Sequence, residues 1–511
     1  MEPAKESLCK HEAAKHPHPT GMSRRSFIVG AAGFGAVSLA ALLGVSGCAP
    51  RLASEAADGA SEEAPSYDII IIGAGGAGMV AALHAFEAGA RVLLLEKNAS
   101  TGGNTNFAEG GMNASETRLQ AENDILDSNT LFAEDTFIGG HEKGNRDLIN
   151  HMCQNSSAAI DWLEDHALPL TKLGTSGGAS VKRIHRPGDG SAVGQYLVTG
   201  LTGLCQESEI DILLQSDVEE ILSTEGVISG VRVVSLESNK TTEYRAPAVI
   251  VAAGGFGANH EMLASYRPEL LDAVTTNLAS AQGDGIALAE ALGAATVDMG
   301  EIQVHPTVEQ NTAILLSEGI RGDGAVLINA EGKRFTNELL TRDAVTAIEW
   351  EQPGGWSYAV FDKEVYDANT SIAKKFEPKG LALQAESLEE LATEMEVDVA
   401  NFMDALTAYN SAIEAETVDP FGRTESRNLI KHPPFYAIKV APGIHHTMGG
   451  IKIDTQAQVI DTTGNVIPGL FAAGEVTGGI HGGNRLGGNA VCDINVYGAQ
   501  AARSALSFVG L

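Results

Sequence analysis

The sequence predicts an α/β protein in which a Rossmann-type dinucleotide-binding domain is interrupted by a second, α+β capping domain. Three observations support this prediction. An apolar strand, a glycine run and a helix pattern follow one another near residue 68. The chain of 511 residues is too long for one ordinary core. From about residue 300 to 443 helix signals become more frequent and dinucleotide-binding features become rarer.

The first element pair is a strand followed by a glycine-rich turn. Asp68 and the isoleucines 69–72 predict a buried parallel strand, and Gly73-Ala74-Gly75-Gly76-Ala77-Gly78 leads into a helix ending near Gly89. A second strand is expected from Arg91 to Glu96. Such a unit places the diphosphate of a dinucleotide at the helix N-terminus, and an acid ending the second strand accepts the ribose hydroxyl. The predicted cofactor-binding residues of this unit are Gly73, Gly75, Gly78 and Glu96.

Later glycine runs extend the same site. Thr101–Thr105 and Gly110–Asn113 follow the second strand as polar loops, and Asp217-Val218 and Val249–Gly255 are expected in strands that return to it. The helix-rich middle, which includes Leu388–Ala415, is expected to form the inserted cap. The predicted dinucleotide-binding domain therefore covers residues 66–299 and 446–511, and the predicted cap covers residues 300–445.

The N-terminus carries the pattern of a targeting segment. Ser23-Arg24-Arg25-Ser26-Phe27 is a twin-arginine motif, followed by an uncharged stretch to Gly47 that is typical of a signal peptide core. Val45–Cys48 resembles a lipoprotein cleavage box, which predicts a lipid on Cys48; plain cleavage near Ala49 is the alternative. We expect residues 1–48 to be a Tat signal and 49–65 a tether, on an exported protein that is periplasmic or at the cell surface.

Charge and cysteines exclude several classes of function. A net charge of −32 argues against nucleic acid or an acidic membrane surface as partner. The five cysteines form no CxxC pattern, so neither a haem attachment site nor a metal site is predicted. An anionic substrate needs local cations to overcome the acidic surface. They are present near the C-terminus, where His445-His446 and Arg485 lie among glycines, a composition suited to holding a carboxylate.

With these residues the chain resembles the soluble fumarate reductase branch of the FAD-binding fumarate reductase/succinate dehydrogenase flavoprotein family, from Tyr67 to the C-terminus. The motifs that carry the resemblance are Gly102–Thr105, Gly177–Val181 with His185–Pro187, Gln303–Thr307, Ser317-Glu318 with Arg321-Gly322, Thr341–Asp343, and the segments around His445 and Arg485. The resemblance implies a Rossmann-type FAD domain, with the substrate held between the flavin and the capping domain.

The resemblance also implies a role for individual residues. The proton donor falls on Arg342, and the relay that refills it falls on Glu318 and Arg321. Substrate-holding residues fall on His305, Ser317, Glu318, His445, Arg485 and Gly488. FAD contacts fall on Glu96, Asn104, Thr105, Gly110, Gly111, Val218, His446, Glu475, Ala490 and Val491.

The chemistry explains this residue set. Reduction of a polarised C=C bond takes a hydride from flavin N5 and a proton on the other carbon, while cations hold the carboxylate. An arginine rarely gives up a proton, so Arg342 acts as an acid only if it is reprotonated at once. The alternatives are that Arg342 only supplies charge, that Glu318 only forms an ion pair, and that His305 is a core residue.

Departures from the family pattern leave the substrate open. Ser317 stands where respiratory fumarate reductases have threonine, and Leu315 and Ser176 stand near family methionines. No flavin-linking histidine occurs in the loop 101–106, so the FAD is expected to be non-covalent. Electrons are expected from a separate cytochrome or quinol-linked protein. We expect reduction of fumarate to succinate in anaerobic respiration. The alternatives are another enoate, such as urocanate, an aromatic acrylate or itaconate, and a non-catalytic electron-relay flavoprotein.

Overall fold

The computed structural model describes residues 65–423 and 428–511, which belong to one compact unit. The expected signal peptide (1–48), and all of the expected tether except its last residue, lie outside the described residues. Among the described helices, none is long and apolar enough to cross a membrane.

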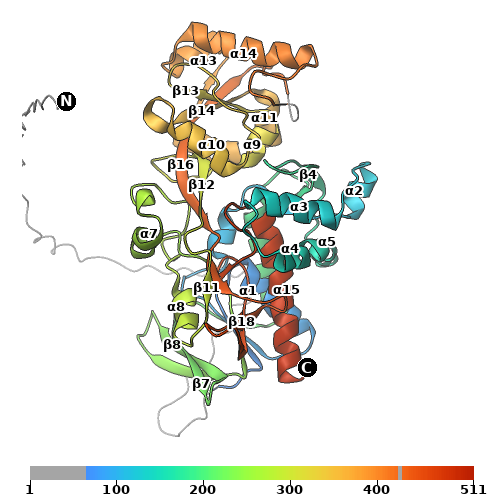
Figure 1. The fold of residues 1–511 in the computed structure, drawn as a ribbon, viewed down its shortest axis with the longest axis vertical. Coiled ribbons are helices and arrows are strands. Elements are labelled where there is room, and N and C mark those ends of the chain that lie inside the picture. The colour runs from blue at the N-terminus through green and yellow to red at the C-terminus, as the bar shows by residue number, and fades with distance from the viewer. Residues whose placement is uncertain (1–64, 424–427) are drawn as a thin grey trace, which may run out of the picture. The chain divides into compact units, whose positions relative to one another are not determined.

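A six-stranded sheet forms the centre of the protein (Figure 1). Its order is β18 (Gln458–Ile460), β19 (Val466–Ala472), β10 (Ala248–Val251), β1 (Ile69–Ile72), β2 (Val92–Leu95) and β6 (Asp211–Leu213). All pairs are parallel except β18–β19. The isoleucines of β1 are buried on both faces, as expected of a central parallel strand. The α/β prediction is confirmed.

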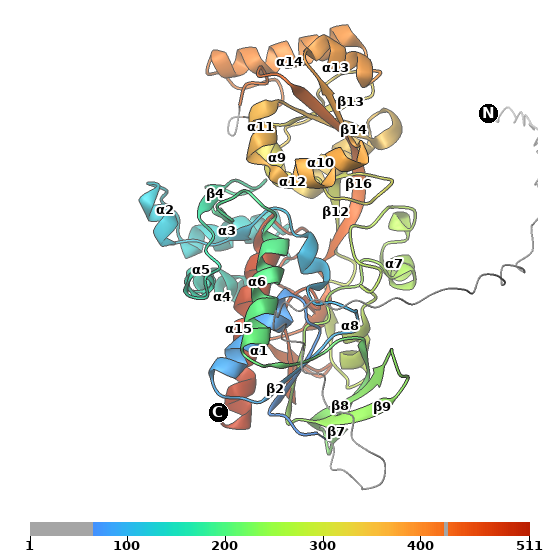
Figure 2. The ribbon, with the colours of Figure 1, turned by 180° about the vertical axis from the view of Figure 1, so that it is seen from behind.

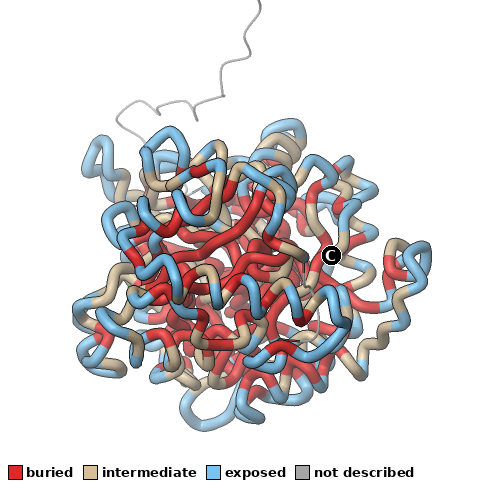
Figure 3. The backbone as a smooth tube through the Cα atoms, turned by 90° about the horizontal axis from the view of Figure 1, so that it is seen from above, coloured by how far each residue is buried: buried red, intermediate tan, exposed pale blue. Residues whose placement is uncertain are grey.

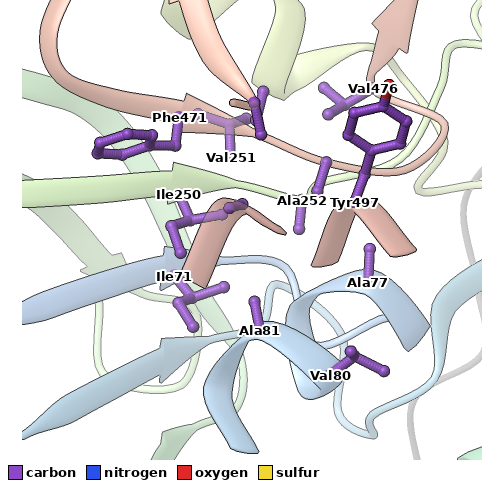
Figure 4. Close-up of a cluster of buried hydrophobic side chains, with 14 of the residues drawn as sticks. Ile71, Ala77, Val80, Ala81, Ile250, Val251, Ala252, Phe471, Val476 and Tyr497 are labelled. Carbon is purple, nitrogen blue, oxygen red and sulfur yellow. The ribbon is translucent and has the colours of Figure 1, made fainter. Parts of the chain in front are cut away.

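Helices cover this sheet. α1 (Gly76–Glu87) packs against α15 (Asn489–Val509) and α6 (Val193–Glu207), as the rear view shows (Figure 2). Small residues of α1, Ala77 and Ala81, lie in a buried cluster with Ile71 and Ile250 of the sheet and Tyr497 of α15 (Figure 4). These small side chains let α1 and α15 pack closely against the sheet next to the turn before α1.

A second sheet lies in the region predicted as the cap. It pairs β12 (Ile302–Val308), β16 (Phe435–Thr447), β14 (Ser357–Phe361) and β13 (Val326–Asn329), with β15 (Ala382–Ala385) also on β16. Two hydrophobic clusters of its own surround it. The domain boundaries stay predictions, and β16 continues across the expected boundary at 445/446. The helices of this region are α9 (Glu318–Gly322), α10 (Arg342–Trp350), α11 (Lys363–Ala368), α12 (Thr370–Lys375), α13 (Leu388–Glu394) and α14 (Val399–Glu414).

The remaining elements complete the unit around these sheets, with buried segments inside and exposed segments at the outer turns (Figure 3). The other strands are β3 (Met112–Asn113), β4 (Lys172–Gly174), β5 (Ile184–Arg186), β7 (Ser216–Thr224), β8 (Val227–Ser235), β9 (Thr241–Arg245), β11 (Thr296–Val297), β17 (Gly450–Lys452) and β20 (Thr477–Gly478). The other helices are α2 (Arg118–Glu122), α3 (Asn129–Gly139), α4 (Arg146–Gln154), α5 (Ser156–Asp165), α7 (His260–Tyr266) and α8 (Asp284–Glu290).

Candidate active site and cofactor cavity

A large cavity, with about 1660 Å³ of empty space when the open solvent at its mouth is included, connects the glycine turn after β1 with the N-terminus of α10. It brings together residues that lie more than 400 positions apart in the sequence. The predicted residues that line it are Gly73, Gly75, Glu96, Asn104, Thr105, Gly110, Gly111, Val218, His446, Glu475, Ala490 and Val491 at one end, and Ser317, Glu318, Arg342, His445, Arg485 and Gly488 at the other. Gly78, His305 and Arg321 lie behind this lining.

The glycines after β1 are explained by close backbone contacts. Gly73 has φ +103°, and a Cβ there would lie 2.4 Å from the carbonyl oxygen of Ala252. A Cβ on Gly78 would lie 1.9 Å from the carbonyl oxygen of Gly73. Gly73 and Gly78 therefore serve the close packing of the turn, while Gly73, Gly75, Gly76 and Ala77 of the motif line the cavity.

Polar side chains around this turn are oriented by the backbone. Glu96 accepts the backbone N–H of Ala74 at 2.9 Å and that of Asn98 at 2.8 Å. Thr105 accepts the backbone N–H of Gly76 at 3.1 Å. The side-chain oxygen of Asn104 accepts the backbone N–H of Leu278 at 2.9 Å. The carboxylate and amide groups predicted to contact a cofactor are thus fixed in place before it binds.

The cavity fits FAD at several points. Gly75 is the N-cap residue of α1 and Gly488 that of α15, and neither glycine has a side chain that could cap its helix. Uncapped N–H groups at a helix N-terminus favour phosphate and other electron-rich atoms. A Cβ on Gly110 or Gly254 would meet nothing within 4 Å, so the wall is open for a bulky group. The buried Nε2 atom of His446 has no hydrogen-bond partner.

At the opposite end Arg342 is held by two partners. It is the first residue of α10, its Nε donates to Glu318 Oε2 at 2.7 Å, and its Nη1 donates to Gln303 Oε1 at 2.9 Å. Gln303 in turn donates to the carbonyl oxygen of Arg485 at 2.7 Å and to Asn484 at 2.8 Å. Gln303 therefore links Arg342, the predicted proton donor, by hydrogen bonds to the loop that contains Arg485, a predicted substrate-holding residue.

Glu318 joins the two arginines of the predicted relay. Its Oε1 accepts the backbone N–H of Gly177 at 2.8 Å and lies 4.0 Å from Arg321 Nη2. Burial alone would raise the pKa of Glu318, but the charges of Arg342 and then Arg321 outweigh burial and lower it to about 2. Glu318 is therefore a carboxylate at neutral pH, flanked by two guanidinium groups.

Arg485 differs from the other buried arginines. Its Nη1 donates to the backbone carbonyl of Leu486 at 3.2 Å, its Nε has no partner, and within residues 65–423 and 428–511 it forms no ion pair. Burial and the neighbouring charge of Arg342 lower its pKa below the usual arginine range. A buried guanidinium without a counter-ion at the wall of a cavity indicates that an anion completes the site.

Two histidines, His305 and His445, add to this end. The backbone N–H of Thr307 donates to His305 Nδ1 at 3.2 Å, which assigns the proton of neutral His305 to Nε2, a buried atom without a partner. The His445 ring lies 5.3 Å from the His305 ring and bonds Thr276 Oγ1 at 2.8 Å. Burial, and then nearby arginines, lower the pKa of His305, His445 and His446 well below 6.5. They are neutral hydrogen-bonding groups at neutral pH.

Ser317 and its neighbours shape the apolar side. The Ser317 hydroxyl accepts the backbone N–H of Gly319 at 3.1 Å and so caps α9, on which Glu318 and Arg321 lie. Leu315 lines the cavity, whereas Ser176 is buried behind it with no partner for its hydroxyl. Of the three departures from the family pattern, Ser317 and Leu315 therefore line the cavity and Ser176 lies behind it.

Sequence reasoning assigned no role to several residues that position the site. Asn113 donates to the carbonyl oxygen of Gly487 and to Asn489, both at 2.7 Å, and holds the glycine loop before α15. The backbone of Gly177 binds Glu318 from 141 positions away. Gln303 and Gly177 belong to motifs that can be recognised in the sequence. The sequence does not show that they contact Arg485 and Glu318.

Comparison with known proteins agrees with this arrangement. A model described as an FAD binding domain matches residues 68–491. The chain is 48% identical over 452 residues to NADH:fumarate oxidoreductase of Klebsiella pneumoniae (strain 342), covering 88% of this chain and 49% of that protein, so it spans about half of that relative's length. It is 34% identical over 458 residues to urocanate reductase of Eggerthella lenta, covering 86% of this chain and 74% of that protein.

A solved structure shows the same fold. The open conformation of a flavocytochrome c3 fumarate reductase superposes with a TM-score of 0.72 at 37% identity, covering 88% of this chain and 79% of that chain. The chain belongs to the fumarate reductase/succinate dehydrogenase flavoprotein family. This confirms the family and fold resemblance, and it identifies FAD as the cofactor and the protein as an oxidoreductase. The roles of individual residues in this flavoprotein stay predictions.

Proposed function

We propose that this flavoprotein reduces an α,β-unsaturated dicarboxylate, with fumarate reduced to succinate as the physiological reaction. The observation that carries the proposal is the unpaired, buried guanidinium of Arg485 beside Arg342 and His445 on one cavity wall. In a chain of net charge −32, such a concentration of cations and N–H donors is suited to an anionic substrate.

The substrate-end residues would hold the two carboxylates and polarise the C=C bond. Arg485 presents a planar fork that matches a carboxylate, and neutral His445 and His305 present ring N–H donors. These donors stabilise the negative charge that builds on the carboxylate during the reaction. Reduced FAD, when bound, supplies the hydride to one carbon of the double bond.

Arg342 supplies the proton to the other carbon. Its Nε and Nη1 are bonded to Glu318 and Gln303, which leaves Nη2 as the group presented to the cavity. A guanidinium is a weak acid, so the donation requires a negative centre at the acceptor carbon and immediate replacement of the proton. Glu318 lies between Arg342 and Arg321 and is placed to pass that proton on.

The surroundings of this reaction are proposed from the sequence. The twin-arginine motif supports export of the folded flavoprotein, with a possible lipid anchor at Cys48. The loop 101–106 contains no histidine, which supports non-covalent FAD. Electrons would come from a separate cytochrome or quinol-linked protein during anaerobic respiration.

An assay of fumarate-dependent oxidation of reduced viologen tests the proposal. Purified, FAD-loaded protein should oxidise the dye only when fumarate is added, with one succinate formed for every two molecules of the one-electron dye oxidised. The same protein with Arg342→Ala is the matched control, since it should keep FAD. No succinate above the rate of the control would reject the assignment.

A second candidate is the same chemistry on another enoate. Ser176 and Leu315 stand near methionines of respiratory fumarate reductases and change the apolar side of the pocket, and one relative is a urocanate reductase. A panel of fumarate, urocanate, an aromatic acrylate and itaconate, compared by kcat/KM, separates the two candidates. A flavoprotein that only relays electrons would show no turnover of any of them.

A further inference from the structure

Asn113 is a buried residue of β3 that lies behind the substrate end of the cavity and does not line it. It forms three hydrogen bonds with the chain just before α15. Its backbone N–H donates to the carbonyl oxygen of Gly488 at 3.2 Å. Its side-chain amide donates to the carbonyl oxygen of Gly487 and to Asn489 Oδ1, both at 2.7 Å. Because Gly487 and Gly488 line the cavity, Asn113 holds two lining residues from the side away from it.

The bond to the Gly487 carbonyl fixes the direction of the peptide group that joins Gly487 to Gly488. This peptide is trans, as almost all peptides outside proline are. In a trans peptide the C=O and the following N–H point in opposite directions. The Gly487 carbonyl points to Asn113, so the Gly488 N–H points away from Asn113, toward the cavity. Among residues 65–423 and 428–511 this N–H has no hydrogen-bond partner.

The amide of Asn113 is itself held in one orientation. Both of its partners, the Gly487 carbonyl and Asn489 Oδ1, can only accept a hydrogen bond, so the NH₂ group must face them. Asn489 is fixed in turn, since its Nδ2 donates to Thr136 Oγ1 at 3.1 Å. The direction of the 487–488 peptide is therefore set by a short chain of buried side chains.

This peptide passes close to the predicted proton donor. A Cβ on Gly487 would lie 2.5 Å from Glu318 Oε2 and 3.3 Å from Arg342 Nη2. A Cβ on Gly488, which has φ +87°, would lie 2.7 Å from Asn113 Oδ1. Glycine at both positions lets the backbone run between Asn113 and the Glu318–Arg342 pair. The Gly488 N–H is therefore a free donor near Arg342 on the cavity wall.

We propose that Asn113 is a positioning residue for the substrate: by binding the Gly487 carbonyl it turns the Gly488 N–H into the cavity, where that N–H donates to a substrate carboxylate. The proposal rests on the proposed enoate reduction. Asn113 touches neither substrate nor FAD and acts only through the 487–488 peptide. The bond on the carbonyl side also polarises the peptide, which strengthens its N–H as a donor.

The surroundings of this N–H favour an anion as its acceptor. Gly488 is the N-cap of α15, a helix of 21 residues, and the dipole of a helix favours negative charge at its N-terminus. Arg342 and the unpaired Arg485 line the same cavity. A carboxylate oxygen held by the guanidinium groups can take the backbone N–H as a further donor.

Asn113→Leu tests the proposal, because leucine has a branched side chain of similar size, lacks the amide, and leaves the backbone bond to Gly488 in place. Fumarate is titrated by calorimetry into the oxidised, FAD-loaded protein, in which it cannot be reduced. We expect Kd to rise about 10- to 100-fold, the usual effect of losing a hydrogen bond to a charged group. FAD affinity should not change, and kcat/KM for fumarate should fall by the same factor.

Asn410→Leu is the matched control. Asn410 lies on α14, does not line the cavity, and also binds a backbone carbonyl through its side-chain amide, that of Ile430 at 3.0 Å. This variant should lower the melting temperature and leave the Kd of fumarate unchanged. The comparison separates a loss of stability from a loss of ligand binding.

Crystal structures of the FAD-loaded wild type and of Asn113→Leu give a second readout that needs no turnover. The Gly487 carbonyl should point to Asn113 in the wild type, and the 487–488 peptide should be turned in the variant. If Asn113→Leu does not fold, Asn113→Ala should give the same rise in Kd.

The outcomes separate this proposal from the proposed function. A variant that keeps FAD and binds fumarate normally overturns the proposal, as does an equal loss of FAD and fumarate affinity. A wild-type protein that binds fumarate with this dependence on Asn113 but never reduces it rejects the proposed function and supports the role of Asn113. A wild-type protein that binds neither fumarate nor any of the other three enoates overturns both.

Discussion

The two ends of the cavity differ in the kind of hydrogen-bond donor that they offer to a ligand. At the glycine end, around Gly75, the donors are backbone N–H groups, and the nearby carboxylate of Glu96 is itself bonded to backbone. At the other end the charged donors are side chains, with Arg342 and Arg485 on the wall and Arg321 behind it. Backbone donors are fixed by the fold and tolerate only small changes of packing, whereas side-chain donors are costly to bury without a partner. The first end suits a permanent cofactor, and the second suits a ligand that comes and goes.

Replacement of Arg342 should give the largest effect, because it should abolish most of the catalytic activity while FAD binding is unchanged. We expect Arg342→Ala to lower kcat about 10⁴-fold, at the upper end of general acid catalysis, because the carbanion loses its proton donor. FAD absorbance should be retained, since the glycine end is unchanged. Arg342→Lys distinguishes the two interpretations of this residue: if only positive charge matters, the lysine variant keeps most of the activity.

Replacement of Arg485 tests whether this residue binds the substrate carboxylate. We expect Arg485→Gln to lower kcat/KM for fumarate by about 10²- to 10³-fold, the usual loss when a preorganised charged donor is removed. The exposed Arg503 of α15 provides a control, and Arg503→Gln should be silent. An Arg485→Gln variant with normal kcat/KM would show that other residues bind the substrate carboxylate.

The pH dependence of stability should reveal Glu318. Its pKa is lowered from 4.5 to about 2 in the folded protein, so its ion pairs contribute stability above pH 4.5 that is lost as the pH falls through 2. The shift corresponds to about 3 kcal/mol. Between pH 4.5 and 2, the free energy of unfolding of the wild type should fall more steeply than that of Glu318→Gln. Parallel curves would contradict the buried ion pair.

The smallest effect is expected at the glycine end. Gly78→Ala places a Cβ 1.9 Å from the carbonyl oxygen of Gly73, so the turn must shift at a cost of about 1–3 kcal/mol. We expect FAD to bind about tenfold more weakly, measured by fluorescence titration of refolded apoprotein. Gly203→Ala on α6, where a Cβ meets nothing within 4 Å, is the matched control and should bind FAD normally.

The sequence allowed the first end to be predicted more completely than the second. Strand, glycine turn, helix and Glu96 lie within about 30 consecutive residues, so local pattern is enough to place them. The hydrogen bonds of Gln303 to Arg485 and of Gly177 to Glu318 span 182 and 141 positions, and no local pattern encodes such partners.

Glu349 illustrates a different limit. In the sequence it lies between Ile348 and Trp350, where polarity alone would bury the aromatic ring and expose the acid. In the fold Trp350 is 48% exposed and Glu349 is buried. The orientation follows from the contacts of α10 with β12 and from the hydroxyl of Ser357, which only the tertiary structure brings together.

The unpaired guanidinium of Arg485 has a consequence beyond catalysis: the folded protein is one counter-ion short. A ligand that supplies this ion and binds only the native state raises the melting temperature, by an amount that grows with the logarithm of its affinity at a given excess concentration. Thermal denaturation in the presence of a series of carboxylates would therefore rank the ligands of the site without any electron donor or redox dye. The carboxylate that raises the melting temperature most at a given concentration is then the ligand that binds the site most tightly.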